Sequence, residues 1–134
     1  MAEYDTNKLV EAAKNARKFS KAHYSNFRVG AALVTKNGEI ITGANVESSS
    51  YSLTICAERV ALTKALTEGK ESFSAIAISA NDGDFCPPCG ACRQLLFDYA
   101  PNIDVILTNG QENKTYKLKD LLPVAFEESK LSKR

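Results

Sequence analysis

Residues 29–46 read VGAALVTKNGEIITGANV, in which two apolar runs flank the four residues Lys-Asn-Gly-Glu. Asn-Gly between two apolar runs is the strongest short-range signal for a β-hairpin. The stretch therefore predicts two antiparallel strands, Val29–Thr35 and Ile40–Val46. We take this hairpin as the start of a sheet and read the chain outward from it.

Periodicity on both sides of the hairpin predicts the remaining elements. Apolar residues recur at helical spacing in Asn7–Lys21, and Pro87-Pro88 introduces a later helix because proline suits a first helical turn. The predicted elements after the hairpin are a helix at Thr54–Glu68, a strand at Ser74–Ala80, a helix at Cys89–Tyr99, strands at Asp104–Thr108 and Thr115–Leu118, and a helical turn or loop at Leu121–Phe126. Helices between strands force part of the sheet to be parallel, so we expect an α/β domain with helices on a mixed sheet of about five strands.

Length and composition fit one domain over residues 1–134. Seventeen Lys and Arg against sixteen Asp and Glu give a net charge of +1, which argues against a nucleic-acid or membrane-surface partner. The N-terminal residues are polar, and no apolar run approaches the roughly 20 residues that cross a bilayer. We therefore expect a cytoplasmic protein, in which the four cysteines are metal ligands, a nucleophile or core residues rather than disulfides.

Two short segments carry the chemistry: Cys56-Ala57-Glu58 and Pro88-Cys89-Gly90-Ala91-Cys92. Cys89 and Cys92 are three residues apart and share one face of a helix, so both sulfurs can reach one ion. Cys56 lies near another helix start, where the helix dipole favours a thiolate. Three thiolates leave one tetrahedral position of a Zn²⁺ open for water, as in catalytic zinc sites. We predict one zinc ion per chain on Cys56, Cys89 and Cys92.

Glu58 is two residues from Cys56 and can lie beside the metal without binding it. A carboxylate in that place can take a proton from water and deliver it to a ring nitrogen and then to departing ammonia. This is the general arrangement of zinc deaminases. Three thiolates on a divalent ion carry a net negative charge, which nearby donors offset. The candidates for hydrogen bonds to the sulfurs are Arg59, Arg93 and Gln94.

Other interpretations of the cysteines remain open at this point. Cys89 and Cys92 alone also fit half of a structural zinc site or a redox pair, and Cys86 could complete a closed four-cysteine site. A cysteine nucleophile is less favoured, because the one histidine, His23, fits a surface or packing position and no base lies near a cysteine in sequence. A third cysteine followed by Glu58 favours the open catalytic site.

From about Leu9 to Phe126, the chain resembles the cytidine deaminases of the short three-cysteine kind, within the cytidine/deoxycytidylate deaminase superfamily. Five blocks in the expected order carry the resemblance: YSNFRVGAA at 24–32, GANVE at 43–47, CAER at 56–59, PCGACRQ at 88–94 and LLPVAF at 121–126. The resemblance implies a three-layer α/β/α fold. It also implies a hydrolase that cleaves a cyclic amidine C–N bond, converting cytidine and deoxycytidine to uridine and deoxyuridine with release of ammonia in pyrimidine salvage.

The resemblance further implies substrate contacts and a homotetramer with shared active sites. Phe27 would line the pocket, and Asn45 with Glu47 would bind the ribose 3′-hydroxyl, since an amide and a carboxylate together read a hydroxyl as donor and acceptor. The other implied contacts are the Ala57 backbone, Tyr51, and Phe126 stacking on the base across a subunit interface. Taken without the resemblance, Phe27 and Phe126 fit a core better and Asn45 fits a turn.

Three competing functions remain. A deaminase of the blasticidin S type shares the zinc motifs, and the ribose-reading pair Asn45 and Glu47 argues against it. A deaminase of polynucleotides is disfavoured by the near-neutral charge and the lack of a basic arm. A zinc-stabilised binding protein without turnover is disfavoured by Glu58, because a structural site has no use for an acid beside an open position.

Overall fold

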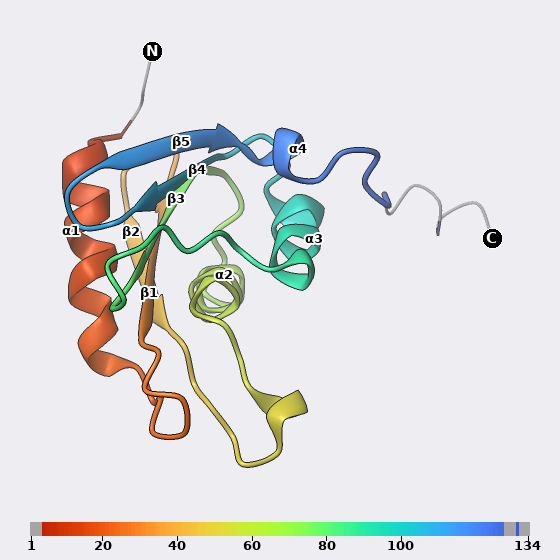
Figure 1. Cartoon of the computed structure of the whole chain (residues 1–134). Helices are drawn as coiled ribbons and strands as arrows, with labels where there is room; N and C mark the ends of the chain where they lie inside the picture. Colours follow the sequence, from red (N-terminus) through yellow and green to blue (C-terminus); the bar gives the residue numbers. More distant parts are fainter. Residues whose placement is uncertain (1–3, 128–130, 132–134) are drawn as a thin grey trace.

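The computed structural model describes residues 4–127 and 131 of the 134-residue chain. Its elements, drawn in Figure 1, are α1 (Thr6–Ala16) continued by the 3-10 turn η1 (Arg17–Phe19), β1 (Val29–Thr35), β2 (Ile40–Ala44), the 3-10 turn η2 (Tyr51–Leu53), α2 (Ala57–Thr67), β3 (Phe73–Ala80), α3 (Gly90–Tyr99), β4 (Asp104–Thr108), β5 (Asn113–Lys117) and α4 (Leu118–Leu121). None of the helices in the described part of the chain is long and apolar enough to span a membrane.

The five strands form one mixed sheet in the order β2-β1-β3-β4-β5. β1 and β2 form the predicted antiparallel hairpin, with Gly30 opposite Ala44 and Val34 opposite Ile40. β3 and β4 are parallel and are joined through α3, whereas β5 returns antiparallel to β4. The mixed sheet with a hairpin and helix-connected parallel strands is therefore confirmed.

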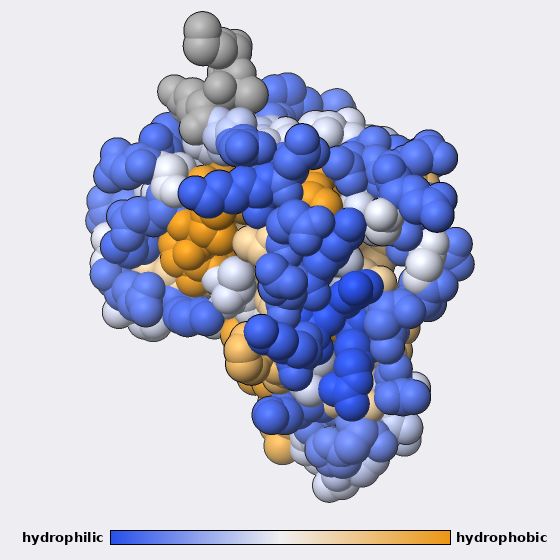
Figure 2. Space-filling view, turned by 90° about the vertical axis from the view of Figure 1, so that its left-hand side faces the viewer, coloured by the Kyte–Doolittle hydropathy of each residue, from blue (hydrophilic) through white to orange (hydrophobic). Residues whose placement is uncertain are grey.

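Helices cover both faces of the sheet: Figure 1 shows α1 on one side and α2 with α3 on the other. The core on the α1 side is built around Leu9, Val10 and Ile106, and the larger core on the other side around Leu62, Ile78 and Leu96. Figure 2, viewed from the α1 side, shows mostly hydrophilic residues on this outer face. α1 thus buries one face against the sheet and presents the other to water.

Two glycines allow the helices to approach the sheet closely. A Cβ atom at Gly30 would lie 2.0 Å from the Ala13 carbonyl oxygen of α1, and one at Gly43 would lie 2.6 Å from the Ala57 carbonyl oxygen of α2. Such distances leave no room for any side chain. Gly43 therefore sets where the first turn of α2 rests on β2.

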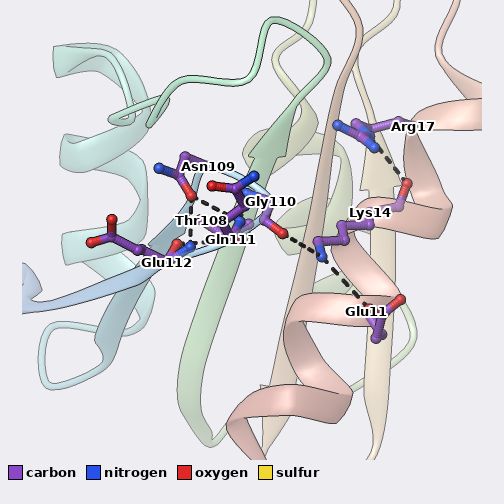
Figure 3. Close-up of polar contacts among 8 residues, drawn as sticks. All are labelled: Glu11, Lys14, Arg17, Thr108, Asn109, Gly110, Gln111 and Glu112. Atoms are coloured by element: carbon purple, nitrogen blue, oxygen red, sulfur yellow. Dashed lines mark hydrogen bonds and ion pairs between the residues drawn. The ribbon is translucent and has the colours of Figure 1, made fainter.

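Polar contacts join the β4–β5 turn to α1, as Figure 3 shows. Lys14 Nζ of α1 donates to the Gly110 carbonyl oxygen at 3.3 Å and lies 3.6 Å from the Glu11 carboxylate. Within the turn, the Asn109 side chain accepts from the backbone N–H groups of residues 111 and 112. These contacts hold the β4–β5 turn against α1.

Several predicted boundaries were wrong by a few residues. α2 begins at Ala57 rather than at Thr54, because Ile55 forms a β-bridge with Val46 and Cys56 is extended (φ −70°, ψ 152°). β2 ends at Ala44, and Val46 makes only isolated bridges. At the other end, β5 spans Asn113–Lys117 and Leu118 already belongs to α4, so the predicted helical turn at 121–126 lies three residues too late.

Candidate active site

Two helix starts bring three thiols together. Cys56 is the N-cap residue of α2, Cys89 is the N-cap residue of α3, and Cys92 is buried in the first turn of α3. Neither N-cap cysteine uses its side chain to cap its helix, so both sulfurs are available for a ligand. The three Sγ atoms lie within 4.8 Å of one another.

This thiol cluster fits a zinc ion. The three sulfur donors lie at two helix N-termini, whose positive dipole ends favour the thiolate form that binds Zn²⁺. Among the described residues, the group placed to hold a metal contains these three cysteines and does not include Cys86. A closed four-cysteine site is therefore not formed, and one ligand position is left for another molecule.

The electrostatic surroundings favour a thiolate at Cys56. A hydrogen bond from Cys92 and then the Arg59 guanidinium, whose Nη2 lies 3.6 Å from Cys56 Sγ, lower the pKa of the Cys56 thiol to about 5 against the effect of burial. The thiolate is the form of cysteine that binds a metal ion, so the lowered pKa of Cys56 favours metal binding at this site. Arg59 Nε is buried and has no hydrogen-bond partner among the described residues.

Glu58 is the one buried carboxylate of the site, with 4% of its surface exposed. It lies in the first turn of α2 directly after Ala57 and lines the same pocket as Cys56 and Cys89. Burial raises the pKa of its carboxyl to about 7, opposed by a backbone hydrogen bond. A carboxyl with a pKa near neutrality can both accept and donate a proton at physiological pH.

The pocket beside the thiol cluster has a volume of about 390 Å³. Four of the residues predicted to bind substrate line it: Phe27, Asn45, Glu47 and Ala57. Cys86 and Pro87 line it as well, on the loop that leads into α3. The structure thus brings two cysteines of the thiol cluster, Glu58 and most of the predicted substrate residues around one small cavity.

Asn45 is buried, and most of its amide is engaged within the protein. Its Oδ1 accepts from the Ser20 hydroxyl and from the Val29 N–H at 3.0 Å, and its Nδ2 donates to the Phe27 carbonyl oxygen at 2.8 Å. An amide nitrogen has two hydrogens, so one N–H remains for a ligand. Asn45 consequently fixes the backbone of Phe27 in addition to facing the pocket.

Glu47 is held by the turn that precedes β1. Its Oε1 accepts from the backbone N–H groups of Tyr24 and Ser25, each at 3.1 Å, and its Oε2 accepts from the Ser25 hydroxyl. The Ser25 hydroxyl first, and the two backbone N–H groups next, lower the pKa of the Glu47 carboxyl. Neither Ser20 nor Ser25 was singled out from the sequence, although Ser25 lies inside the quoted block at 24–32.

Other predicted residues lie outside this pocket in the single chain. Tyr51 is 81% exposed and lines a neighbouring pocket of about 310 Å³ with Tyr24 and Ser48. Phe126 is 53% exposed, and its carbonyl oxygen accepts from Gln94. Arg93 donates to the carbonyl oxygens of residues 88 and 121. Gln94 donates to the Asp98 carboxylate and to the Phe126 carbonyl oxygen.

Three clustered thiols and a buried glutamate at the starts of two helices of an α/β fold are the arrangement found in zinc-dependent deaminases. Residues 3–108 match the family model described as the cytidine and deoxycytidylate deaminase zinc-binding region. The chain therefore belongs to the cytidine and deoxycytidylate deaminase family.

Individual relatives agree with this assignment. A cytidine deaminase of Halalkalibacterium halodurans is 45% identical over 91% of this chain and 94% of its own length. A probable cytidine deaminase of Dictyostelium discoideum is 42% identical over 98% of this chain and 90% of its own length. The crystal structure of cytidine deaminase from Burkholderia pseudomallei superposes with a TM-score of 0.87 at 47% identity, covering 91% of this chain and 99% of that one. A blasticidin-S deaminase of Bacillus cereus is 35% identical over 88% of this chain and 89% of its own.

Proposed function

We propose that this protein is a zinc-dependent cytidine deaminase that hydrolyses cytidine and deoxycytidine to uridine and deoxyuridine with release of ammonia. The observation that carries the proposal is that the thiol cluster, through Cys56 and Cys89, and the buried Glu58 line one cavity of about 390 Å³. The near-full-length similarity to cytidine deaminases of other organisms supports the same substrate class.

Different residues of the site bind the metal, transfer protons and offset charge. Cys56, Cys89 and Cys92 would hold Zn²⁺, which when bound would act as a Lewis acid and make water nucleophilic near neutral pH. Glu58 takes one proton from the attacking water and gives it to the ring N3. It then takes the second proton from the hydroxyl newly bound to C4 and gives it to the amino group, so that the C4–N bond breaks, the C4 carbonyl forms and ammonia leaves. Its pKa of about 7 suits a group that must do both. Arg59 offsets the negative charge of the sulfurs through its contact with Cys56.

Binding residues orient the nucleoside for this chemistry. Phe27 and the backbone of Ala57 flank the base, and the remaining Asn45 N–H and the Glu47 carboxylate bind the sugar 3′-hydroxyl as donor and acceptor.

Ammonia release by the purified protein tests this function, with cytidine, deoxycytidine, cytosine, cytidine monophosphate and blasticidin S offered in parallel. Turnover of the two nucleosides alone is the expected result. Turnover of blasticidin S alone would keep the zinc chemistry and overturn the assigned sugar contacts. No ammonia release from any of the five compounds would contradict the proposed function.

The finer biological setting follows from the same function. We infer a homotetramer in which Tyr51 and Phe126, both exposed and outside the pocket of their own chain, complete the site of a neighbour. Light scattering of the purified protein should give four times the chain mass of 14.6 kDa, and a monomer with full activity would contradict this arrangement. A role in pyrimidine salvage and a cytoplasmic location, which cell fractionation would check, complete the proposal.

A further inference from the structure

One serine bonds both to the carboxylate proposed to read the sugar and to the wall of the pocket. The Ser25 hydroxyl donates to Glu47 Oε2 and accepts from the Phe27 N–H at 3.0 Å. The Ser25 backbone N–H also donates to Glu47 Oε1 at 3.1 Å. Ser25 itself lines the pocket that contains Glu58.

These bonds leave Glu47 with one defined acceptor position. An ionised carboxylate offers about four lone-pair sites and no donor. Two sites on Oε1 are filled by the Tyr24 and Ser25 N–H groups, and one on Oε2 is filled by the Ser25 hydroxyl. The remaining site lies on Oε2, the oxygen that Ser25 orients. Without the hydroxyl, the carboxylate loses the bond that fixes this oxygen, and Phe27 loses its N–H acceptor.

We propose that Ser25 is a positioning residue for substrate specificity: its hydroxyl fixes the Glu47 carboxylate so that Oε2 accepts the sugar 3′-hydroxyl. This inference rests on the proposed function, because it assigns a second residue to the sugar end of the same pocket. Ser25 acts in binding and not in the chemical step, since its hydroxyl bonds Glu47 and Phe27 rather than Glu58 or the thiol cluster.

The test compares Ser25→Ala, Ser25→Thr and the unchanged protein on cytidine and on 2′,3′-dideoxycytidine, which lacks the 3′-hydroxyl. Ser25→Ala should raise KM for cytidine about tenfold, the size expected when a hydrogen bond to a charged group is lost, with kcat within about twofold. KM for the dideoxynucleoside should stay unchanged, and Ser25→Thr, which keeps a hydroxyl, should restore most of the affinity for cytidine.

Two further variants separate positioning from a general structural effect. Ser25→Ala made in a Glu47→Gln background should have little added effect, because coupled residues are not additive. Ser72→Ala, an exposed serine beside β3 at a distance from the pocket, is the matched control and should behave as the unchanged protein.

Each outcome decides the inference. Three results for Ser25→Ala would overturn the role of Ser25 while leaving the deaminase function intact. They are an equal rise in KM for cytidine and for the dideoxynucleoside, a fall in kcat without a change in KM, and an unchanged KM for cytidine. If Ser25→Ala does not fold, a Ser25→Thr protein with tenfold weaker cytidine binding would likewise overturn it. If the unchanged protein does not deaminate cytidine, the proposed function fails, and the inference fails with it.

Discussion

Arg59 follows Glu58 directly on α2, and the two side chains have different surroundings. Glu58 is buried in the pocket, whereas Arg59 reaches back to Cys56 Sγ at 3.6 Å. Arg59→Ala should lower the rate of cytidine deamination about 10–100-fold at unchanged zinc content, because the negative charge of the sulfurs is no longer offset. Arg59→Lys should recover part of the rate, and Lys64→Ala on the exposed side of α2 serves as the control. An Arg59→Ala protein with normal zinc and normal turnover would refute the role of Arg59.

Tyr4 supplies a pH-dependent contact away from the site. Its hydroxyl donates to Asp104 Oδ2 at 2.7 Å, and burial first, then this bond, raise the pKa of Tyr4 from 10.0 to about 12. A raised pKa means that the folded protein favours the protonated form, so the stabilisation is complete below pH 10 and is lost as pH rises through 12.

Tyr4→Phe should therefore lower the melting temperature at pH 8 by the equivalent of about 1 kcal/mol. The difference between variant and unchanged protein should shrink between pH 10 and pH 12, as followed by thermal melts. A difference that stays constant over this range would show that the hydroxyl proton is not involved.

Spacing was enough to predict that Cys89 and Cys92 converge, because they lie within one helix turn. Cys56 lies at the start of a different helix, so its meeting with them depends on the packing of α2 beside α3. The bonding of Asn45 and Glu47 was not predictable in the same way. Their partners, Ser20 and Ser25, lie more than 20 residues earlier in the chain, and only the folded arrangement of the turn before β1 brings them together. Interactions of this kind leave no periodic signal in the sequence.

At the scale of elements, the contact of α2 with β2 positions the first turn of the active-site helix. Gly43→Ala would place a Cβ 2.6 Å from the Ala57 carbonyl oxygen, and Gly30→Ala would place one 2.0 Å from the Ala13 carbonyl oxygen. Both substitutions should cost about 1–3 kcal/mol of stability through overpacking. Gly43→Ala should reduce activity more than Gly30→Ala at temperatures where both variants are folded, because α2 carries Glu58 whereas α1 carries none of the proposed catalytic groups.

Chemical denaturation and initial rates of cytidine deamination, measured on both glycine variants, check this prediction. Equal activity of the folded Gly43→Ala and Gly30→Ala proteins would show that the position of α2 is not critical for the reaction.

Most elements were predictable from local pattern, and the errors have physical causes. The Asn-Gly turn located the β1–β2 hairpin correctly, with Gly38 at a φ of 89°. The start of α2 was placed too early at Thr54, since threonine is a common N-cap and cysteine is not. The actual N-cap, Cys56, makes no capping bond with its side chain, so its sulfur is free for the metal.

For the whole molecule, zinc joins two helices that lie on the same face of the sheet. Removing it with a chelator should abolish cytidine turnover and lower the melting temperature by roughly 10 °C, because a ligand bound only by the folded state stabilises it by mass action. Circular dichroism should change little, since the two hydrophobic cores include none of the three cysteines that hold the metal. Re-addition of zinc should restore both properties, and Cys86→Ser should bind zinc normally. Full activity after complete zinc removal would contradict the metal's role.

The most direct test of the central claim is the rate of ammonia release from cytidine by a Glu58→Gln protein whose zinc content is measured in the same preparation. The account predicts one zinc ion per chain and a rate at least about 100-fold below that of the unchanged protein, since the proton carrier is lost while the thiols remain. Glu68→Gln, at the exposed end of α2, should keep the full rate. A zinc-loaded Glu58→Gln protein that deaminates cytidine at a rate near that of the unchanged protein would contradict the account.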